Sequence, residues 1–94
     1  LVTKDEVANF NNLHMWLKVN GKMMQDNNTD DMIFEVPFLV SYISQFMTLL
    51  PGDVISTGTP AGVALGMKTP IYLKRGDVIE LGIEGLGEQK QVAV

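Results

Sequence analysis

Apolar and polar residues alternate from residue 13 to residue 19. A period of two is typical of a half-buried strand. The dipeptide Asn20-Gly21 follows at once, and it readily adopts the positive φ angles of a type I′ turn. We therefore predict a hairpin that pairs residues 13–19 with residues 22–25. The apolar positions of the first strand are Leu13, Met15, Leu17 and Val19.

The middle of the chain changes to a helical spacing. Residues 26–31 are polar and predict a loop, after which Pro37 can occupy the first turn of a helix, where its missing N–H costs nothing. The helix should run to about Met47 and end before Pro51-Gly52. Its apolar residues follow an i, i+3, i+4 spacing and predict a stripe that faces a core. They are Leu39, Val40, Ile43, Phe46, Met47 and Leu50.

A short apolar run and a loop come next. Residues 54–57 predict a short buried strand. Residues 58–66 are rich in Gly and Pro and predict a loop. Binding residues are often carried on loops, so this segment is the first place to look for a function.

The end of the chain returns to a period of two. Ile79, Leu81 and Ile83 alternate with polar residues and Gly82, which predicts a strand with one face in water. A turn at residues 85–87 leads into a last strand over 89–94 and closes a second hairpin. The whole pattern predicts a mostly β fold with one helix (α+β), in a single domain.

Composition narrows the class of protein. Hydrophobic residues make up 46% of the 94 residues and charged residues 19%, as in ordinary folded proteins. The net charge is −4 and the seven Lys and Arg are scattered, so we expect no nucleic-acid partner. The chain has no cysteine, which excludes disulfides, thiol catalysis and Cys-type zinc sites. We expect a cytoplasmic protein, because a chain without cysteine fits a reducing compartment.

Two further expectations concern the membrane and the extent of the chain. The apolar region at residues 32–50 is interrupted by Glu35 and Pro37, among others, and so falls short of the roughly 18 residues of a membrane span. We therefore expect no membrane partner. The chain opens at Leu1 rather than at a methionine, and we expect it to be part of a longer protein.

His14 and a run of side-chain oxygens are candidates for chemistry. His14 is the only histidine, and without a Gly-x-Ser-x-Gly motif nearby we expect it to be structural. Asp26, Asn28 and Asp30 have the spacing that opens an EF-hand loop. The sixth position, however, is Asp31 instead of Gly, and the twelfth is Pro instead of Glu. We therefore expect Asx turns and helix capping there rather than calcium binding.

The remaining carboxylates and methionines suggest no site. Glu80 and Glu84 would share one face of a strand about 13 Å apart, at ~3.3 Å per residue, which is too far for a shared metal or an acid–base pair. We expect them on a solvated face. The six methionines are expected to fill apolar space.

The loop after the predicted third strand has the best composition for a ligand site. Its small residues let a ligand approach the backbone, with hydroxyls at Ser56, Thr57 and Thr59 and free amides at Gly58 and Thr59. Such a turn can donate several hydrogen bonds to a carboxylate or phosphate. No Lys follows the glycines, so the loop is not a P-loop.

Residues 57–63 read TGTPAGV and resemble the TGTP-x-GV signature of the fumarylacetoacetate hydrolase family. Residues 17–25 are similar to the family's L-x-VNG-x-x-x-Q hairpin, and residues 1–7 to the segment that follows its catalytic lysine. The similarity extends over nearly the whole chain. The other matching segments are residues 28–34, 44–49, 72–77 and 82–87.

The resemblance implies the C-terminal part, over residues 1–94, of a catalytic domain with a β-roll architecture that is incomplete in this chain. It further implies a homodimer, a Mg²⁺ or Mn²⁺ cofactor, and 2-oxo or 2,4-dioxo acids as substrates. The metal would act as a Lewis acid on the substrate while water cleaves a carbon–carbon bond and pyruvate is released. Thr59 is the expected substrate contact, and Gly58 and Thr57 would shape it.

The chain departs from the family pattern in ways that concern catalysis. The family's metal ligands, a Glu-x-Glu pair and a later Asp, have no counterpart here, and Lys4 is not the catalytic lysine. Ala64 replaces the second Gly of the usual Gly-Val-Gly. We therefore expect no catalytic residue and no metal ligand among these 94 residues, and no turnover by them alone.

Three other activities occur in the same family: isomerase, hydratase and oxaloacetate decarboxylase. A different class of function, a non-catalytic β-domain or a truncation product, is the alternative for the chain as it stands. An upstream Glu-x-Glu segment in the reading frame would decide for the enzyme.

Overall fold

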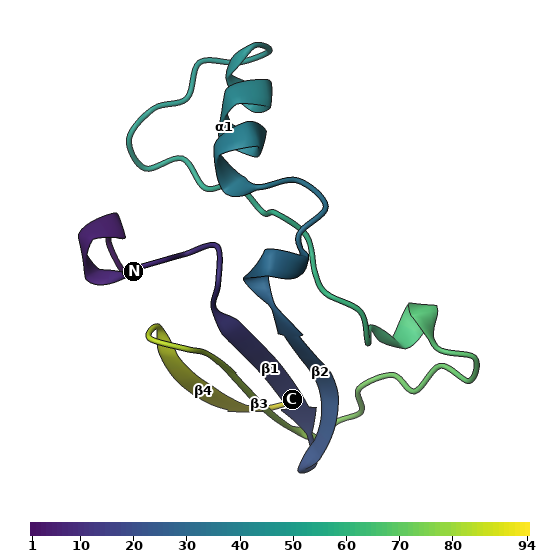
Figure 1. The fold of residues 1–94 in the computed structure, drawn as a ribbon. Helices are drawn as coiled ribbons and strands as arrows, with labels where there is room; N and C mark the ends of the chain where they lie inside the picture. Colours follow the sequence, from purple (N-terminus) through teal and green to yellow (C-terminus); the bar gives the residue numbers. More distant parts are fainter.

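The computed structural model describes all residues 1–94 as a four-stranded antiparallel sheet with one α-helix outside it (Figure 1). The strand order is β2-β1-β3-β4. The predicted class, mostly β with one helix, is confirmed. The strands are β1 (His14–Val19), β2 (Lys22–Asn28), β3 (Val78–Ile83) and β4 (Gly87–Val92), the helix is α1 (Val36–Ser44), and single 3₁₀ turns lie at Lys4–Glu6, Thr29–Asp31 and Ala64–Gly66.

Both predicted hairpins are present. At the first turn Asn20 has φ 51° and Gly21 φ 80°, as the predicted type I′ turn requires. Strand β1 pairs with β3 so that apolar residues stand directly opposite one another, which gives these two central strands one apolar face. These cross-strand pairs are Met15 with Ile83, Leu17 with Leu81, and Val19 with Ile79.

Strand β2 is longer than predicted, so the assignment of residues 26–28 to a loop is wrong. Pairing continues to Asn28, which lies opposite His14. Polar residues can extend a strand when a neighbouring strand offers hydrogen bonds, because backbone pairing does not depend on the side chain. The register also shifts between Leu17 and Lys18, so that Met24 of β2 has no partner on β1. This extra residue is a β-bulge.

Two predictions for the middle of the chain are wrong. Residues 54–57 form no strand, because no other segment pairs with them, and the Val54 side chain is 93% exposed. The helix ends at Ser44 instead of continuing to Met47. Residues 45–47 form a turn in which the Met47 N–H still donates to the Ile43 carbonyl.

The predicted core is also absent. No hydrophobic side chain is buried, and α1 packs on no strand over an extended area. Figure 1 shows the helix standing away from the sheet. The Cα radius of gyration is 15.5 Å, against about 13 Å for a compact chain of 100 residues. The predicted apolar stripe therefore faces no core within residues 1–94.

No helix in the structure combines the length and the apolar character that crossing a membrane requires.

Candidate substrate-binding loop

The TGTP loop, residues 57–60, lies against strand β2, together with Gly62. Gly62 has φ +110°, and a Cβ built on it would be 2.0 Å from the Met24 carbonyl oxygen. No side chain fits in that space, so glycine is required both for the backbone angle and for the close approach. Gly58 has φ +102° but open space around it, so there only the backbone angle requires glycine.

Gln25 joins the loop to the sheet. Its Nε2 donates to Thr59 Oγ1 over 3.0 Å and to the Pro60 carbonyl over 2.8 Å. Gln25 is half-buried and stands opposite Leu17 on β1, so its side chain lies on the same face of the sheet as Leu17. In Figure 1 the chain after α1 passes along β2, where these bonds form.

The structure places the three predicted site residues at the surface. Thr57, Gly58 and Thr59 are all exposed, and only the Thr59 hydroxyl bonds to the sheet. The amides of Gly58 and Thr59 have no hydrogen-bond acceptor within the chain. Two backbone donors and one hydroxyl are thus available together for an anionic group. The roles of these residues in substrate binding stay predictions.

Gln25 was missed as a site residue by the sequence reasoning. It lies in the hairpin motif that marked the family resemblance, but nothing in its local sequence points to a loop 34 residues away. A polar residue at this position gave no signal of its own, because Asn27, Gln89 and Gln91 stand opposite apolar residues on the same face of the sheet.

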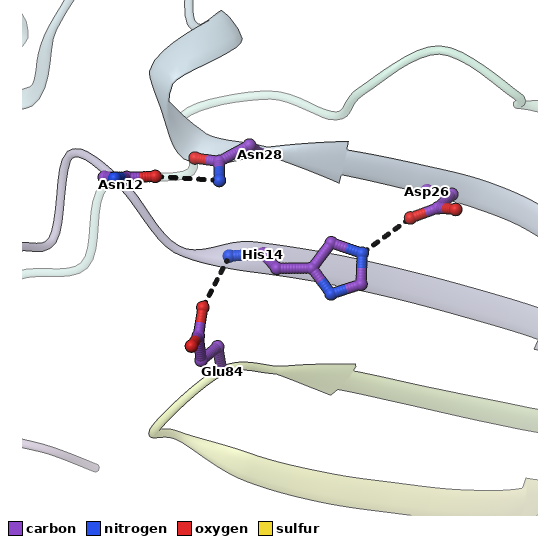
Figure 2. A network of polar contacts seen from close by, with 5 residues as sticks. All are labelled: Asn12, His14, Asp26, Asn28 and Glu84. Carbon is purple, nitrogen blue, oxygen red and sulfur yellow. Dashed lines mark hydrogen bonds and ion pairs between the residues drawn. The ribbon is translucent and has the colours of Figure 1, made fainter.

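A separate polar network surrounds His14 (Figure 2). His14 Nε2 lies 2.6 Å from Asp26 Oδ1. The backbone N–H of His14 donates to the Glu84 carboxylate over a long distance of 3.4 Å. Asn28 Nδ2 donates to Asn12 Oδ1 over 2.9 Å. The His14 and Asp26 side chains are both more than half exposed. Since Asp26 follows Gln25 on the same strand, the two side chains point to opposite faces, and the network is not part of the TGTP loop.

The other sequence candidates have structural roles. The Asn28 side chain accepts from the Asp30 N–H over 3.0 Å and caps the 3₁₀ turn, which confirms the predicted capping. Glu80 pairs with Lys90 across β3 and β4 over 3.0 Å. A shallow hollow of about 440 Å³ lies beside His14, Trp16 and Glu84, but it is wide open and away from the loop.

The residues of this chain do not fit a divalent metal. No three His, Asp or Glu side chains come together anywhere in it. Beside the TGTP loop the side chains within bonding distance are Gln25 and Thr59, which are neutral. Mg²⁺ and Mn²⁺ prefer sites with carboxylate oxygens.

The sequence is similar to one protein family and to named relatives over nearly its whole length. The family model described as fumarylacetoacetate (FAA) hydrolase C-terminal matches residues 1–94. A Burkholderia multivorans protein provisionally named a hydrolase is 55% identical over 93 residues, covering 98% of this chain. The match covers 33% of that relative, so the chain spans about a third of its length.

Solved structures share the fold. A Mycobacterium smegmatis protein provisionally named HpcE has a TM-score of 0.95 and 40% identity, over 100% of this chain and 35% of its own. A maleylpyruvate hydrolase from Sphingobium, solved with manganese(II) and pyruvate, has a TM-score of 0.86 and 37% identity. The match covers 100% of this chain and 33% of the hydrolase chain. A Mycobacterium marinum 2-hydroxyhepta-2,4-diene-1,7-dioate isomerase has a TM-score of 0.77 and 41% identity. The match covers 93% of this chain and 32% of the isomerase chain.

Proposed function

This chain belongs to the fumarylacetoacetate hydrolase family, and we propose that it forms the C-terminal third of a metal-dependent hydrolase. The substrate is a 2,4-dioxo acid, either an acylpyruvate or a dioxo sugar acid. Water cleaves the carbon–carbon bond between the C3 methylene carbon and the C4 oxo carbon. The acyl carbon takes the hydroxyl and leaves as a carboxylic acid, while the methylene carbon takes the proton and leaves as pyruvate.

The observation that carries the proposal is the group of hydrogen-bond donors at the TGTP loop. The Thr59 hydroxyl and the amides of Gly58 and Thr59 are exposed at one turn. Donors grouped in this way suit the carboxylate of a 2-oxo acid. The 37% identical maleylpyruvate hydrolase solved with manganese(II) and pyruvate supports an acid of this class and a divalent metal.

The roles of the chain follow from what it contains. Thr59 and Gly58 bind the substrate carboxylate and orient it, and Thr57 shapes the turn. No residue of this chain is proposed as catalytic. Mg²⁺ or Mn²⁺ would be held by residues outside 1–94, since none here are grouped for it.

The test is an assay of the complete protein that carries residues 1–94. It should release pyruvate from an acylpyruvate with Mg²⁺ or Mn²⁺ and stop doing so with a chelator, and residues 1–94 alone should be inactive. Thr59→Val should raise KM about tenfold or more, because a hydrogen bond to a charged group is worth ~1.5–3 kcal/mol. Ser56→Ala, a hydroxyl deletion in the same segment, is the control. Metal-independent pyruvate release would contradict the proposal.

An isomerase is the second candidate, favoured by the 41% identity to the Mycobacterium marinum isomerase. Mass spectrometry of the products separates the two reactions. An isomerase leaves the mass of the substrate unchanged, whereas a hydrolase adds water and yields two acids.

We propose further that the complete protein is a cytoplasmic homodimer. Four aromatic side chains follow one side of α1 and are 52–70% exposed, and large exposed apolar patches usually mark contact surfaces. A monomer in analytical ultracentrifugation, or recovery outside the cytoplasmic fraction of cells, would contradict these two points. The aromatic residues are Phe34, Phe38, Tyr42 and Phe46.

A further inference from the structure

The Pro60 carbonyl determines how the Gln25 amide is oriented. An amide side chain can present either its oxygen or its NH₂ group, and the choice follows from its partners. A carbonyl oxygen only accepts hydrogen bonds, so the Gln25 atom 2.8 Å from it must be the NH₂ nitrogen. That nitrogen has two hydrogens, and the second is directed to Thr59 Oγ1 over 3.0 Å.

The orientation of Gln25 in turn fixes the role of the Thr59 hydroxyl. Because Oγ1 accepts from Gln25, one of its lone pairs is occupied, and its own proton remains to be donated. Within the chain the only acceptor for that proton is the Pro60 carbonyl, at 3.5 Å. This is well beyond the ~2.7–2.8 Å typical of an O–H···O bond, so the proton is available to a ligand oxygen.

We infer that Gln25 is a positioning residue that makes the Thr59 hydroxyl a hydrogen-bond donor toward an anionic oxygen of the substrate. The inference rests on the proposed function, and it specifies the ligand at this turn as an acceptor, a carboxylate oxygen, rather than an amine or a hydroxyl that must itself donate. Gln25 does not touch the substrate in this scheme and acts through Thr59.

The bulge in β2 explains how a strand residue reaches the loop. Met24 is the extra residue of the strand, and its carbonyl lies where a Cβ on Gly62 would be. Bulges turn neighbouring side chains to a new direction and often occur next to active sites. Met24 and Gln25 therefore hold the two ends of residues 59–62, one by close backbone contact and the other by hydrogen bonds.

The first test compares Gln25→Glu and Gln25→Met in the complete protein. A carboxylate only accepts hydrogen bonds, so in Q25E the Thr59 hydroxyl would donate to the new carboxylate and point away from the substrate, whereas Q25M leaves the hydroxyl free to donate to the substrate. We expect Q25E to raise KM about tenfold to a hundredfold, Q25M to raise it less, and kcat to change less than KM in both. Gln89→Glu, the same change at an exposed glutamine of β4, should match the parent. Equal KM values for Q25E and Q25M would overturn the inference.

The second test uses pH. A carboxyl group beside the Pro60 carbonyl can be protonated as the pH falls from about 8 toward 5, because Glu titrates near 4.3 when unperturbed and higher beside an acceptor. The protonated carboxyl group can again donate to Thr59 Oγ1. The ratio of the KM of Q25E to the KM of the parent should therefore decrease as the pH is lowered. A loss caused by disturbed folding of the loop would not recover, and a ratio independent of pH counts against the inference.

The third test separates this inference from the proposed function. In the T59V background the effect of Q25E on KM should shrink at least severalfold, because the hydroxyl through which it acts is gone. Independently of any activity, hydrogen exchange in residues 57–63 should be faster in Q25M than in the parent. If the parent releases no pyruvate, the proposed function fails. If exchange is unchanged, Gln25 does not position the loop, whatever the activity.

Discussion

The sheet and the middle segment, residues 32–73, are organised in opposite ways. In the sheet all four strands are hydrogen-bonded to neighbours, and its apolar residues other than Val92 are more than half-covered. In the middle segment the bonds are local turns of the helix and loops, and large side chains such as Ile33 and Leu65 are 91% and 81% exposed. The sheet needs only itself to satisfy its backbone, whereas the middle segment needs another surface to cover its side chains.

The two regions are joined at one place. The only hydrogen bonds between residues 32–73 and the sheet are those from Gln25 to Thr59 and Pro60. In addition, the backbone of Gly62 lies close to the Met24 carbonyl. The proposed binding loop is therefore the point where a segment with no other hydrogen bond to the sheet is attached to it. The site should be sensitive to changes at this joint and insensitive to changes elsewhere in the sheet.

The largest effect is expected from breaking the joint with Gly62→Ala. The new Cβ would overlap the Met24 carbonyl at 2.0 Å, so the loop must move away from β2. Strain at a positive φ adds roughly 1–2 kcal/mol. We expect activity of the complete protein to fall at least tenfold, with faster proteolysis within residues 57–67. Gly66→Ala, where the nearest atom is 3.7 Å away and φ is ordinary, is the control, and equal activity of both variants would refute the close contact.

A smaller effect is expected within the sheet, from Gly82→Ala. Gly82 is the one buried residue, and an added Cβ would be 3.0 Å from the Trp16 ring. Overpacking of this kind costs about 1–3 kcal/mol, measurable as a lower urea midpoint for unfolding, with KM unchanged because the joint is intact. In the double variant Trp16→Leu/Gly82→Ala, the smaller side chain at residue 16 leaves room for the new Cβ, so part of the lost urea midpoint should be recovered. A KM change in G82A would show that the two regions are coupled more widely.

A pH-dependent effect is expected at Asp77, which directly precedes the central strand β3. Hydrogen bonds from the Asn20 side chain and from the Lys74 backbone hold the pKa of Asp77 below its ordinary value. A lowered pKa in the folded state stabilises the fold above the unfolded pKa of about 3.9, and this stabilisation is lost as the pH falls through the folded value. Asp77→Asn should lower the urea midpoint at neutral pH, and the gap to the parent should close in acid. A gap that persists at pH ~2 would contradict this cause.

The smallest effect is expected for the surface pair of Lys90 with Glu80. Its atoms are 3.0 Å apart, but the Lys90 side chain is 67% exposed, and such pairs contribute ~0–1 kcal/mol. Lys90→Met should shift the free energy of unfolding by less than about 0.5 kcal/mol, and 1 M salt should remove the difference. A larger, salt-resistant shift would mean that β4 depends on this pair.

Sequence reasoning succeeded where a structure depends on neighbouring residues. The alternation at residues 13–19 and the Asn20-Gly21 turn predicted the first hairpin, and the alternation at Ile79, Leu81 and Ile83 predicted the second. It failed where pairing decides the outcome. Residues 54–57 are apolar enough for a strand but have no partner, and residues 26–28 are polar but have one.

The candidate site divides in the same way. The sequence by itself determined the hairpins, a helix with Pro37 in its first turn, the run of small residues at 57–60 and the family resemblance, since all depend on local spacing and motif. Only the tertiary structure decided that the helix has no core to face, and that Met24 and Gln25 hold the loop. The physical reason is that a contact between residues 25 and 59 depends on strand register and a bulge, and neither is encoded within a few residues of either partner.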